Sequence, residues 1–249
     1  MGNQVARIED LENVKINNYY MISLPKVGNH SIRKLLKNNN IKIKNERSHN
    51  IIELNYILNN ESNNLFIAGI RNPLQIMISL YFQTYHLTHG RAITNKHPTG
   101  FNLIPLCKEN DIVNMSEQQI INDYFSKKDF LTFFNEFMND FFDVTKINTV
   151  PFNKERGIQL YKLKNNNYML FYVLEKINKN TNYICNLLNI PLQSIPHEDN
   201  SENKIYNNKY NSVKPKIKYS KKYLDSILNT NIINYFYLTE DIQKMYSQI

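Results

Sequence analysis

The sequence predicts a single α/β domain in which helices flank a central, mainly parallel sheet. Short apolar runs typical of buried strands alternate with segments of helical periodicity, and no internal repeat or clear linker divides the 249 residues. The apolar fraction of 42% is large enough to build a substantial core, which argues against disorder of the whole chain.

The N-terminal elements alternate strand and helix. Residues 19–24 form a short, aromatic-rich apolar run that stops at Pro25, as expected of a buried strand. A helical pattern follows over 31–37. Isoleucines then alternate with lysines within 41–47, which is the period of a second strand, and residues 51–58 have the pattern of the next helix.

The same alternation continues further along the chain. Residues 65–70 are continuously apolar, as in a strand buried on both faces. Pro73 stands where proline favours a helix start, so a helix is expected over 74–82. Residues 168–174 predict a fourth core strand, and a helix is expected near 181–188. Parallel strands joined in this way require right-handed crossovers.

The remaining segments surround this core. Residues 116–142 predict a helical insert that covers one face of the sheet. Residues 190–218 are polar and rich in lysine, so we expect a long loop, and helices return over 219–248. Phenylalanines recur at helical spacing in the insert and are expected to be mainly core: Phe130, Phe133, Phe134, Phe137 and Phe141.

Charge and cysteine content limit the partner and the compartment. A net charge of +8 and a pI near 9.2 favour an anionic partner, without separating nucleic acid, acidic lipid and a phosphorylated small molecule. Cys107 and Cys185 are too few for a disulfide framework or a thiolate metal site, so a reducing compartment is expected. No apolar stretch has transmembrane length and no secretory pattern is present, so we expect a cytoplasmic protein.

A candidate phosphate-binding turn follows the first predicted strand. Residues 25–31 carry one lysine, Lys26, and one glycine, and they lead directly into a helix. A helix N-terminus favours an anion, Lys26 adds a mobile positive charge, and the Ser31 hydroxyl can donate to a phosphate. The turn is not a Walker A loop, which requires Gly-Lys followed by Ser or Thr. Taken alone, an ordinary capped turn explains this string equally well.

Polar side chains follow the other predicted strands as well. His49 comes after the second strand, Arg71 after the third, and Glu175 after the fourth, where we expect a structural cap or ion-pair partner. Ser79 stands eight residues beyond the arginine in an otherwise apolar helix, where a hydroxyl needs a partner. Ligands of open parallel sheets bind at the carboxyl ends of the strands, so we expect these residues to meet Lys26 at one edge.

These residues resemble two motifs of PAPS-dependent sulfotransferases. Residues 25–31, with the pattern Pro-Lys-x-Gly-x-x-Ser, are similar to the 5′-phosphosulfate loop of that family. Residues 71–73, Arg-Asn-Pro, with Ser79 and Tyr81 at the matching interval, are similar to its 3′-phosphate motif. The resemblance covers residues 19–83.

The later chain is similar, through looser patterns, to a bacterial branch of capsular polysaccharide synthesis proteins. Residues 137–161 and 223–246 carry that similarity. The two resemblances together imply a P-loop-like sulfotransferase fold, with the cofactor-binding core at about 19–83 and 168–190. They also imply transfer of a sulfuryl group from PAPS (3′-phosphoadenosine 5′-phosphosulfate) to a hydroxyl of a carbohydrate or polysaccharide precursor, with PAP as product and no metal.

The resemblance also implies a role for each matching residue. Lys26 would stabilise the charge that develops as the sulfuryl group leaves, and the residues after it would cradle the 5′-phosphate. Arg71 and Ser79 would bind the 3′-phosphate. His49 stands where many members carry the catalytic base, which a poorly nucleophilic hydroxyl requires. The implied cofactor-binding residues are Lys26, Val27, Gly28, Asn29, His30, Ser31, Arg71 and Ser79.

Several assignments stay open. The C-terminal Arg-Lys-Gly loop of the cytosolic branch is absent, and the lysine that would replace it is one of Lys204, Lys209, Lys214, Lys216 and Lys218. The aromatic side chain that stacks on adenine, the acceptor and the oligomeric state are not readable from the sequence. His86, His89 and His97 lack the carboxylate or thiolate that would complete a metal site, so we expect them to shape the acceptor pocket.

Two other functions are compatible with part of the sequence. An ATP- or GTP-dependent kinase or NTPase could use the 25–31 turn, but no aspartate that could bind Mg²⁺ follows the third strand. A basic nucleic-acid-binding protein would fit the pI, but the lysines are scattered and no recognised binding motif is present.

Overall fold

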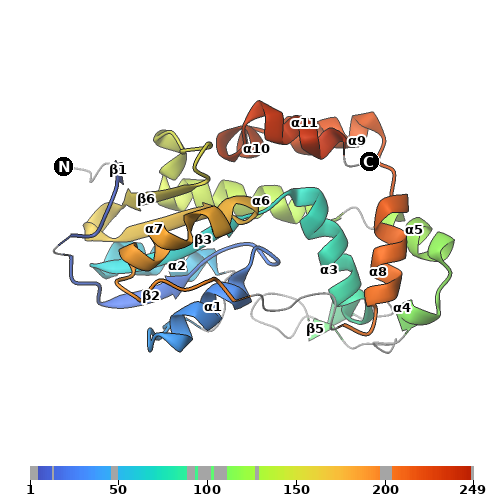
Figure 1. Cartoon of the computed structure of the whole chain (residues 1–249). Coiled ribbons are helices and arrows are strands. Elements are labelled where there is room, and N and C mark those ends of the chain that lie inside the picture. Colours follow the sequence, from blue (N-terminus) through green and yellow to red (C-terminus); the bar gives the residue numbers. More distant parts are fainter. Residues whose placement is uncertain are drawn as a thin grey trace.

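A mixed five-stranded sheet with helices packed around it forms the centre of the computed structural model (Figure 1). The structure describes residues 5–12, 14–45, 50–88, 93–94, 102–103, 111–126, 129–196 and 204–247. The strands of the sheet are β1 (Ala6–Ile8), β2 (Asn18–Met21), β3 (Asn64–Ile70), β6 (Ile158–Lys162) and β7 (Tyr168–Val173); β4 (Ile93–Thr94) and β5 (Asn102–Leu103) pair separately.

The helices follow the expected alternation in the first half of the chain and dominate the second half. The α-helices are α1 (Asn29–Asn38), α2 (Ile51–Asn60), α3 (Pro73–Thr88), α4 (Asp111–Asn114), α5 (Glu117–Ser126), α6 (Asp129–Thr145), α7 (Thr181–Leu187), α8 (Asn207–Val213), α9 (Lys221–Leu228), α10 (Asn231–Phe236) and α11 (Thr239–Ser247). Short 3-10 turns are η1 (Ile147–Thr149), η2 (Lys164–Asn166), η3 (Leu174–Asn180) and η5 (Lys214–Lys216).

The strand order is β1-β6-β7-β3-β2. Strands β2, β3 and β7 are parallel neighbours, as the sequence predicted, whereas β6 runs antiparallel between β7 and β1. The sheet is therefore mixed rather than mainly parallel. The sequence prediction missed β6 and β1 because the apolar pattern of β6 is only five residues long and includes Gln159 and Lys162, and β1 has only three residues.

Over its described part, residues 41–45, the expected second strand at 41–47 is wrong as a strand. Residue Ile43 forms a single parallel bridge with Tyr19. Beyond it, the buried side-chain amide of Asn45 replaces a backbone partner of Met21: it accepts from the Met21 N–H at 2.9 Å and donates to the Met21 carbonyl at 2.7 Å. The alternating pattern placed this segment correctly beside β2, but a side chain completes the pairing that a ladder would have made.

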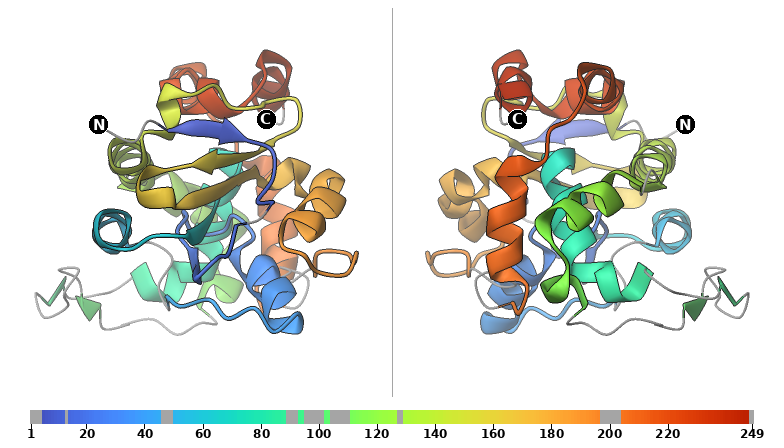
Figure 2. Two further views of the ribbon diagram at one scale, coloured as in Figure 1. Left: turned by 90° about the vertical axis from the view of Figure 1, so that its left-hand side faces the viewer. Right: turned by 90° about the vertical axis from the view of Figure 1, so that its right-hand side faces the viewer.

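Alternate residues of each central strand pack into cores on opposite faces of the sheet. In β3, Leu65 and Ile67 join the side of α1 and α7, whereas Phe66 and Ala68 join the side of α2 and α6. Figure 2 shows α2 and α6 on one side of the sheet and α1 and α7 on the other. Both faces are covered, which explains why β3 is buried throughout and apolar from Leu65 to Ile70.

The two crossovers that follow β2 run in opposite directions across the sheet. The chain passes through α1 to the bridge at Ile43 on one side of β2, then returns through α2 to β3 on the other side. Since α1 and α2 lie on opposite faces, a topological switch point lies between β2 and β3. Ligands of open α/β sheets bind at such a point, outside the carboxyl ends of the strands.

The predicted helical insert is two helices, α5 and α6. Helix α6 covers one face of the sheet, where the ring centre of Phe141 lies 5.8 Å from the ring centre of Phe171 in β7. Of the aromatic stripe, Phe134, Phe137 and Phe141 are buried and Phe133 is exposed, while the Phe130 side chain lies outside the described residues.

The expected loop at 190–218 is wrong over part of its length, because α8 and η5 lie within it. Tyr206, Tyr210 and Val213 recur at helical spacing, and the rings of both tyrosines pack on Phe82 of α3. Asparagine and lysine surround these apolar residues and hid the pattern. The expected C-terminal helices are α9, α10 and α11.

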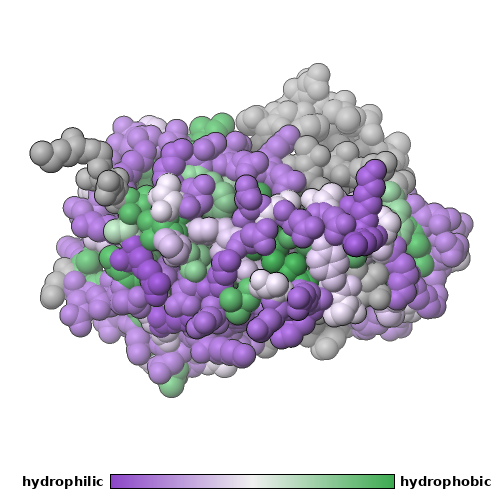
Figure 3. All heavy atoms as spheres, turned by 90° about the horizontal axis from the view of Figure 1, so that it is seen from above, coloured by the Kyte–Doolittle hydropathy of each residue, from purple (hydrophilic) through white to green (hydrophobic). Residues whose placement is uncertain are grey.

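Within the described part of the chain, no helix is long and apolar enough to cross a membrane. Seen from the side of α9 to α11, the surface is hydrophilic over most of its area, and apolar atoms occur in small separate patches (Figure 3).

Candidate functional site

The turn after β2 has a backbone that few residues adopt. Lys26 has a φ of +63° and Gly28 a φ of +85°, so two residues of one short turn are in the left-handed region. At Gly28 the close approach of β7's end adds a second constraint, because a Cβ there would lie 2.7 Å from Cδ1 of Leu174. The glycine of the motif is therefore required by both conformation and space.

The carbonyl groups of this turn are held by donors from the protein. The Tyr172 hydroxyl donates to the Val27 carbonyl at 2.9 Å, and Arg71 Nη1 donates to the Lys26 carbonyl at 3.3 Å. The Asn29 side chain donates to the Leu24 carbonyl at 3.1 Å. These bonds hold the carbonyl groups of Leu24, Lys26 and Val27 in place beside the N-terminus of α1, where the helix dipole is positive.

The side chains of the turn have different surroundings. Val27 is fully buried, so only its backbone can reach a ligand, whereas Lys26 is half-buried and His30 exposed. Asn29 is buried and accepts a 2.6 Å hydrogen bond from the Ser23 hydroxyl, which makes its side chain structural. Ser31 stands half-buried in the first turn of α1.

Arg71 joins the end of β3 to the turn after β2. Besides the Lys26 carbonyl, its guanidinium contacts Gln75, whose Oε1 accepts from Nη2 at 3.0 Å. Gln75 lies in the first turn of α3, so the arginine is held from two elements in one orientation. Lys26 and Arg71, which the sequence predicted to meet, do lie side by side at the switch point.

Glu175 supports the same corner from η3, the turn that follows β7. Its Oε1 accepts from the Asn72 N–H at 2.8 Å, and its Oε2 accepts from the Tyr237 hydroxyl at 3.2 Å. Asn72 in turn accepts from the Leu74 N–H through Oδ1 at 3.0 Å, which caps α3. Glu175 therefore acts as a structural cap, in agreement with the sequence interpretation.

The charge of Glu175 is disfavoured by its surroundings. The residue keeps solvent-exposed surface, but its carboxyl lies among protein atoms, and this desolvation raises the pKa of Glu175 above the ordinary glutamate value. Backbone N–H groups of Asn72 and of Glu175 itself, and the positive charge of Arg71, oppose the rise. Burial likewise raises the pKa of the Tyr237 hydroxyl, which stays a donor to the carboxylate.

Ser79 lies further along α3 than the other predicted residues. It follows the helix start by six residues, or roughly 9 Å of helix rise. Gln75, Ser79 and Gln83 are the half-buried positions of one stripe at intervals of four residues, between buried apolar neighbours. A ligand group held by both Arg71 and Ser79 must therefore extend along this stripe.

His49 lies outside the described residues, so its predicted role as a base is not tested. The side chains of His86, His89 and His97 lie outside them too. In the part of the chain that the structure describes, no group of three or more His, Cys, Asp or Glu side chains is arranged to hold a metal ion.

Sequence reasoning missed the residues that position this site. Tyr172 lies in β7 and Tyr237 at the end of α10, and both fit the apolar pattern of those elements. Only the hydrogen bonds of their hydroxyl groups show their role. The role of Gln75, in contrast, could have been predicted. It stands in the first turn of a helix, four residues beyond an arginine, and this spacing indicates a paired donor and acceptor.

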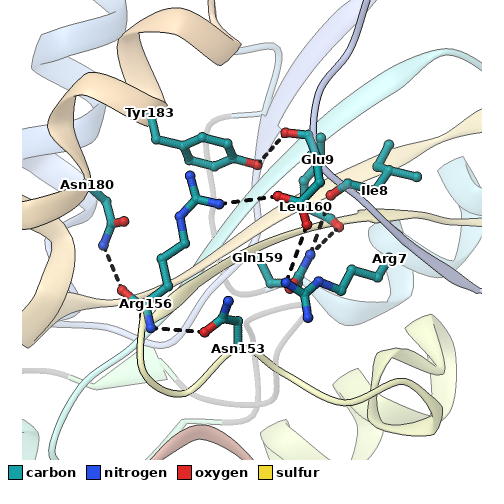
Figure 4. A network of polar contacts seen from close by, with 9 residues as sticks. All are labelled: Arg7, Ile8, Glu9, Asn153, Arg156, Gln159, Leu160, Asn180 and Tyr183. Atoms are coloured by element: carbon teal, nitrogen blue, oxygen red, sulfur yellow. Dashed lines mark hydrogen bonds and ion pairs between the residues drawn. The ribbon is translucent and has the colours of Figure 1, made fainter.

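A second polar network lies at the same edge of the sheet, beyond β7 (Figure 4). Arg156, in the turn before β6, pairs with Glu9 at 3.3 Å and stacks on the Tyr183 ring, with Cζ 3.7 Å from the ring centroid. Arg7 contacts the same carboxylate at 3.3 Å. These arginines share Glu9 as a counter-ion and hold β1, the turn and α7 together.

A cavity of about 900 Å³ lies away from these residues. It is lined by α2, the end of α6 and the turn between β6 and β7, including Leu58, Val144 and Leu163. That turn precedes β7, so the cavity lies at the opposite end of the strands from the 25–31 turn and Arg71. Volume alone does not make it the site, since its lining brings together no convergent set of catalytic groups.

No known protein family, curated protein or solved structure matches this chain significantly. The assignment of function therefore depends on the geometry at the switch point and on the motif resemblance.

Proposed function

We propose that this protein is a sulfotransferase that moves a sulfuryl group from PAPS to a hydroxyl of a carbohydrate or polysaccharide precursor. The observation that carries the proposal is the junction of the 25–31 turn with Arg71 at the topological switch point, where Arg71 Nη1 contacts the Lys26 carbonyl at 3.3 Å. Two anion-binding features meet there, and the cofactor bears phosphate at two positions.

In this proposal the turn and the start of α1 bind the 5′-phosphate through the helix dipole and backbone N–H groups, from Val27 to Ser31. Lys26 lies at the bond that breaks. The planar fork of Arg71 binds the 3′-phosphate, and Ser79 contributes from one side of α3. Arg71 is already oriented by Gln75, so it loses little freedom on binding.

The reaction is a direct transfer. The acceptor hydroxyl oxygen attacks sulfur, the bond between sulfur and the bridging phosphate oxygen breaks, and PAP leaves with the bonding electron pair. The acceptor proton passes to His49 in this account. Lys26 stabilises the negative charge that grows on the bridging oxygen, so electrostatic stabilisation and positioning provide most of the rate.

A transfer assay tests the proposal. The protein is incubated with PAPS and a panel of saccharides, and products are detected by a mass increase of one sulfuryl group. His49→Ala should bind PAP as the wild type does and lose transfer by roughly 100-fold or more. Retained transfer without His49 would remove the base from the account, and absence of transfer to any hydroxyl acceptor would contradict the proposed activity.

A further inference from the structure

One segment near the C-terminus carries a large excess of positive charge. Residues 204–224 contain seven lysines and no aspartate or glutamate, so they supply seven of the eight excess positive charges. The rest of the chain is close to neutral as a sum, and residues 13–45 hold a second run of seven basic residues (Lys or Arg) without an aspartate or glutamate.

The second half of this segment is an ordered strip. Val213, Ile217 and Leu224 are buried against the core, and the lysines between and beside them are exposed. We use the term lysine strip for these exposed residues: Lys214, Lys216, Lys218, Lys221 and Lys222. Because apolar anchors alternate with them, the ammonium groups are presented by a fixed backbone rather than by a loose tail.

Few carboxylates neutralise the lysine strip. Lys216 pairs with Glu117 of α5. For the other four lysines, the described residues hold no carboxylate within ion-pair distance, and Lys214 lies instead 5.5 Å from the centre of the Tyr210 ring. Asp225, which follows the strip, accepts from the Tyr246 hydroxyl at 2.8 Å. The strip therefore keeps most of its positive charge for a partner.

The lysine strip is attached to the helix that begins beside Arg71. Tyr219 and Tyr223 stack with their ring centres 5.5 Å apart, and the Tyr223 hydroxyl lies 3.9 Å from Sδ of Met77 in α3. Figure 1 shows α8 beside α3, with α9 continuing above them. A long ligand that reaches the proposed transfer site from this side can contact the strip.

We infer that the lysine strip binds an acidic polysaccharide, which would be the acceptor of the proposed transfer. The identity of this polysaccharide as the acceptor rests on the proposed function. Its binding to the lysine strip rests on the charge distribution. Several exposed lysines close together in the chain act as separate point charges, which suits the repeated carboxylate or sulfate groups of such a polysaccharide.

Nucleic acid fits the lysine strip less well. The strip contains no arginine, which is the residue that recognises base edges and phosphates with a planar fork. Single-stranded nucleic acid is usually bound by exposed aromatic rings. The rings of Tyr219 and Tyr223 are half-buried and occupied with each other, and Tyr210 is buried.

The test compares two triple variants of equal charge change. Lys214→Gln with Lys218→Gln and Lys222→Gln removes three charges from the strip, whereas Lys42→Gln with Lys162→Gln and Lys179→Gln removes three exposed lysines elsewhere. Binding to labelled polygalacturonate, neutral dextran and a single-stranded DNA oligonucleotide is measured by fluorescence anisotropy at two salt concentrations.

We expect polygalacturonate to bind the wild type in a salt-dependent way, dextran not to bind, and the strip variant to bind at least about tenfold more weakly than the control variant. Equal binding by the two variants, or tighter binding of DNA through the same lysines, would overturn the inference. Stabilisation by PAP is measured on the same proteins. If PAP stabilises none of these proteins, the proposed function fails. Polyanion binding by the strip is judged separately, from the anisotropy alone.

Discussion

Lys26 holds a backbone φ of +63° in the turn that carries the proposed chemistry. A left-handed conformation costs a residue with a Cβ free energy that glycine does not lose. Lysine at this position is thus unfavourable for stability, and the proposed role of its side chain in transfer offers a reason for its presence. The same turn contains Gly28, whose conformation and packing both exclude a larger residue.

Lys26→Gly should raise the free energy of unfolding by about 1 kcal/mol and lower sulfuryl transfer by roughly 100-fold. Asn40→Gly is the matched control, because Asn40 is exposed and has a φ of +59° but lies outside the site. Urea denaturation and the transfer assay measure both quantities. Loss of stability in Lys26→Gly would contradict the strained conformation, and full activity would contradict the role of the side chain.

Gly28→Ala should destabilise the fold by about 1–3 kcal/mol, because it adds a Cβ where Leu174 already lies. The double variant with Leu174→Ala removes the contact but not the positive φ. We expect the double variant to lose less stability than the two single variants lose in sum, as measured by thermal unfolding. Strict additivity would show that the contact is unimportant.

Glu175 predicts a pH dependence of stability. A carboxyl whose pKa is raised by folding binds more protons in the folded state, so its stabilising contribution is complete below the ordinary value of 4.5 and is lost as the pH rises through the folded pKa. Compared with Glu175→Gln, the wild type should lose relative stability between about pH 4 and neutral pH. An increase in relative stability over that range would show that ion pairing, not desolvation, controls this carboxyl.

At the scale of elements, the sequence predicted the parts of the sheet that repeat a simple pattern. Continuous apolar runs located β2, β3 and β7, and proline located the start of α3. It did not locate β6 and β1, because a short antiparallel edge is specified by pairing with distant residues. It also misassigned α8, whose apolar stripe is interrupted by asparagine and lysine.

The segment after α1 illustrates why the second expected strand does not form. The Asn45 amide makes both hydrogen bonds to Met21 that a backbone neighbour would make, and Arg33 donates to the Asn45 carbonyl at 3.3 Å. Alternating isoleucines can predict the position of such a segment. They cannot predict that an asparagine side chain takes the place of the ladder.

Asn45→Ala should lower the free energy of unfolding by about 2–3 kcal/mol, because two buried backbone groups of Met21 lose their partners. Asn17→Ala is the matched control: Asn17 is exposed and donates a single 3.0 Å hydrogen bond to the Ser62 carbonyl. We expect it to cost less than about 1 kcal/mol in urea denaturation. Similar losses in both variants would contradict the substitute-backbone role of Asn45.

At the scale of the whole molecule, the fold brings residues from two distant motifs to one point. Lys26 and Arg71 were predicted to meet because each follows a strand of a parallel sheet, and they do. Sequence alone could not show that the meeting point is a topological switch point, since that depends on which side of β2 each crossover passes. Nor could it reveal the hydroxyl groups of Tyr172 and Tyr237 as groups that orient the site.

The junction of the 25–31 turn with Arg71 is proposed to bind a nucleotide with phosphates at both its 3′ and 5′ positions. Calorimetric titration with PAP, in parallel with ATP and Mg²⁺, tests it most directly on the wild type, on Arg71→Gln and on the exposed control Arg7→Gln. We predict that PAP binds the wild type and the control equally, that it binds Arg71→Gln roughly 10- to 100-fold more weakly, and that ATP with Mg²⁺ binds less tightly than PAP. Tight binding of ATP with Mg²⁺ and none of PAP would contradict the account.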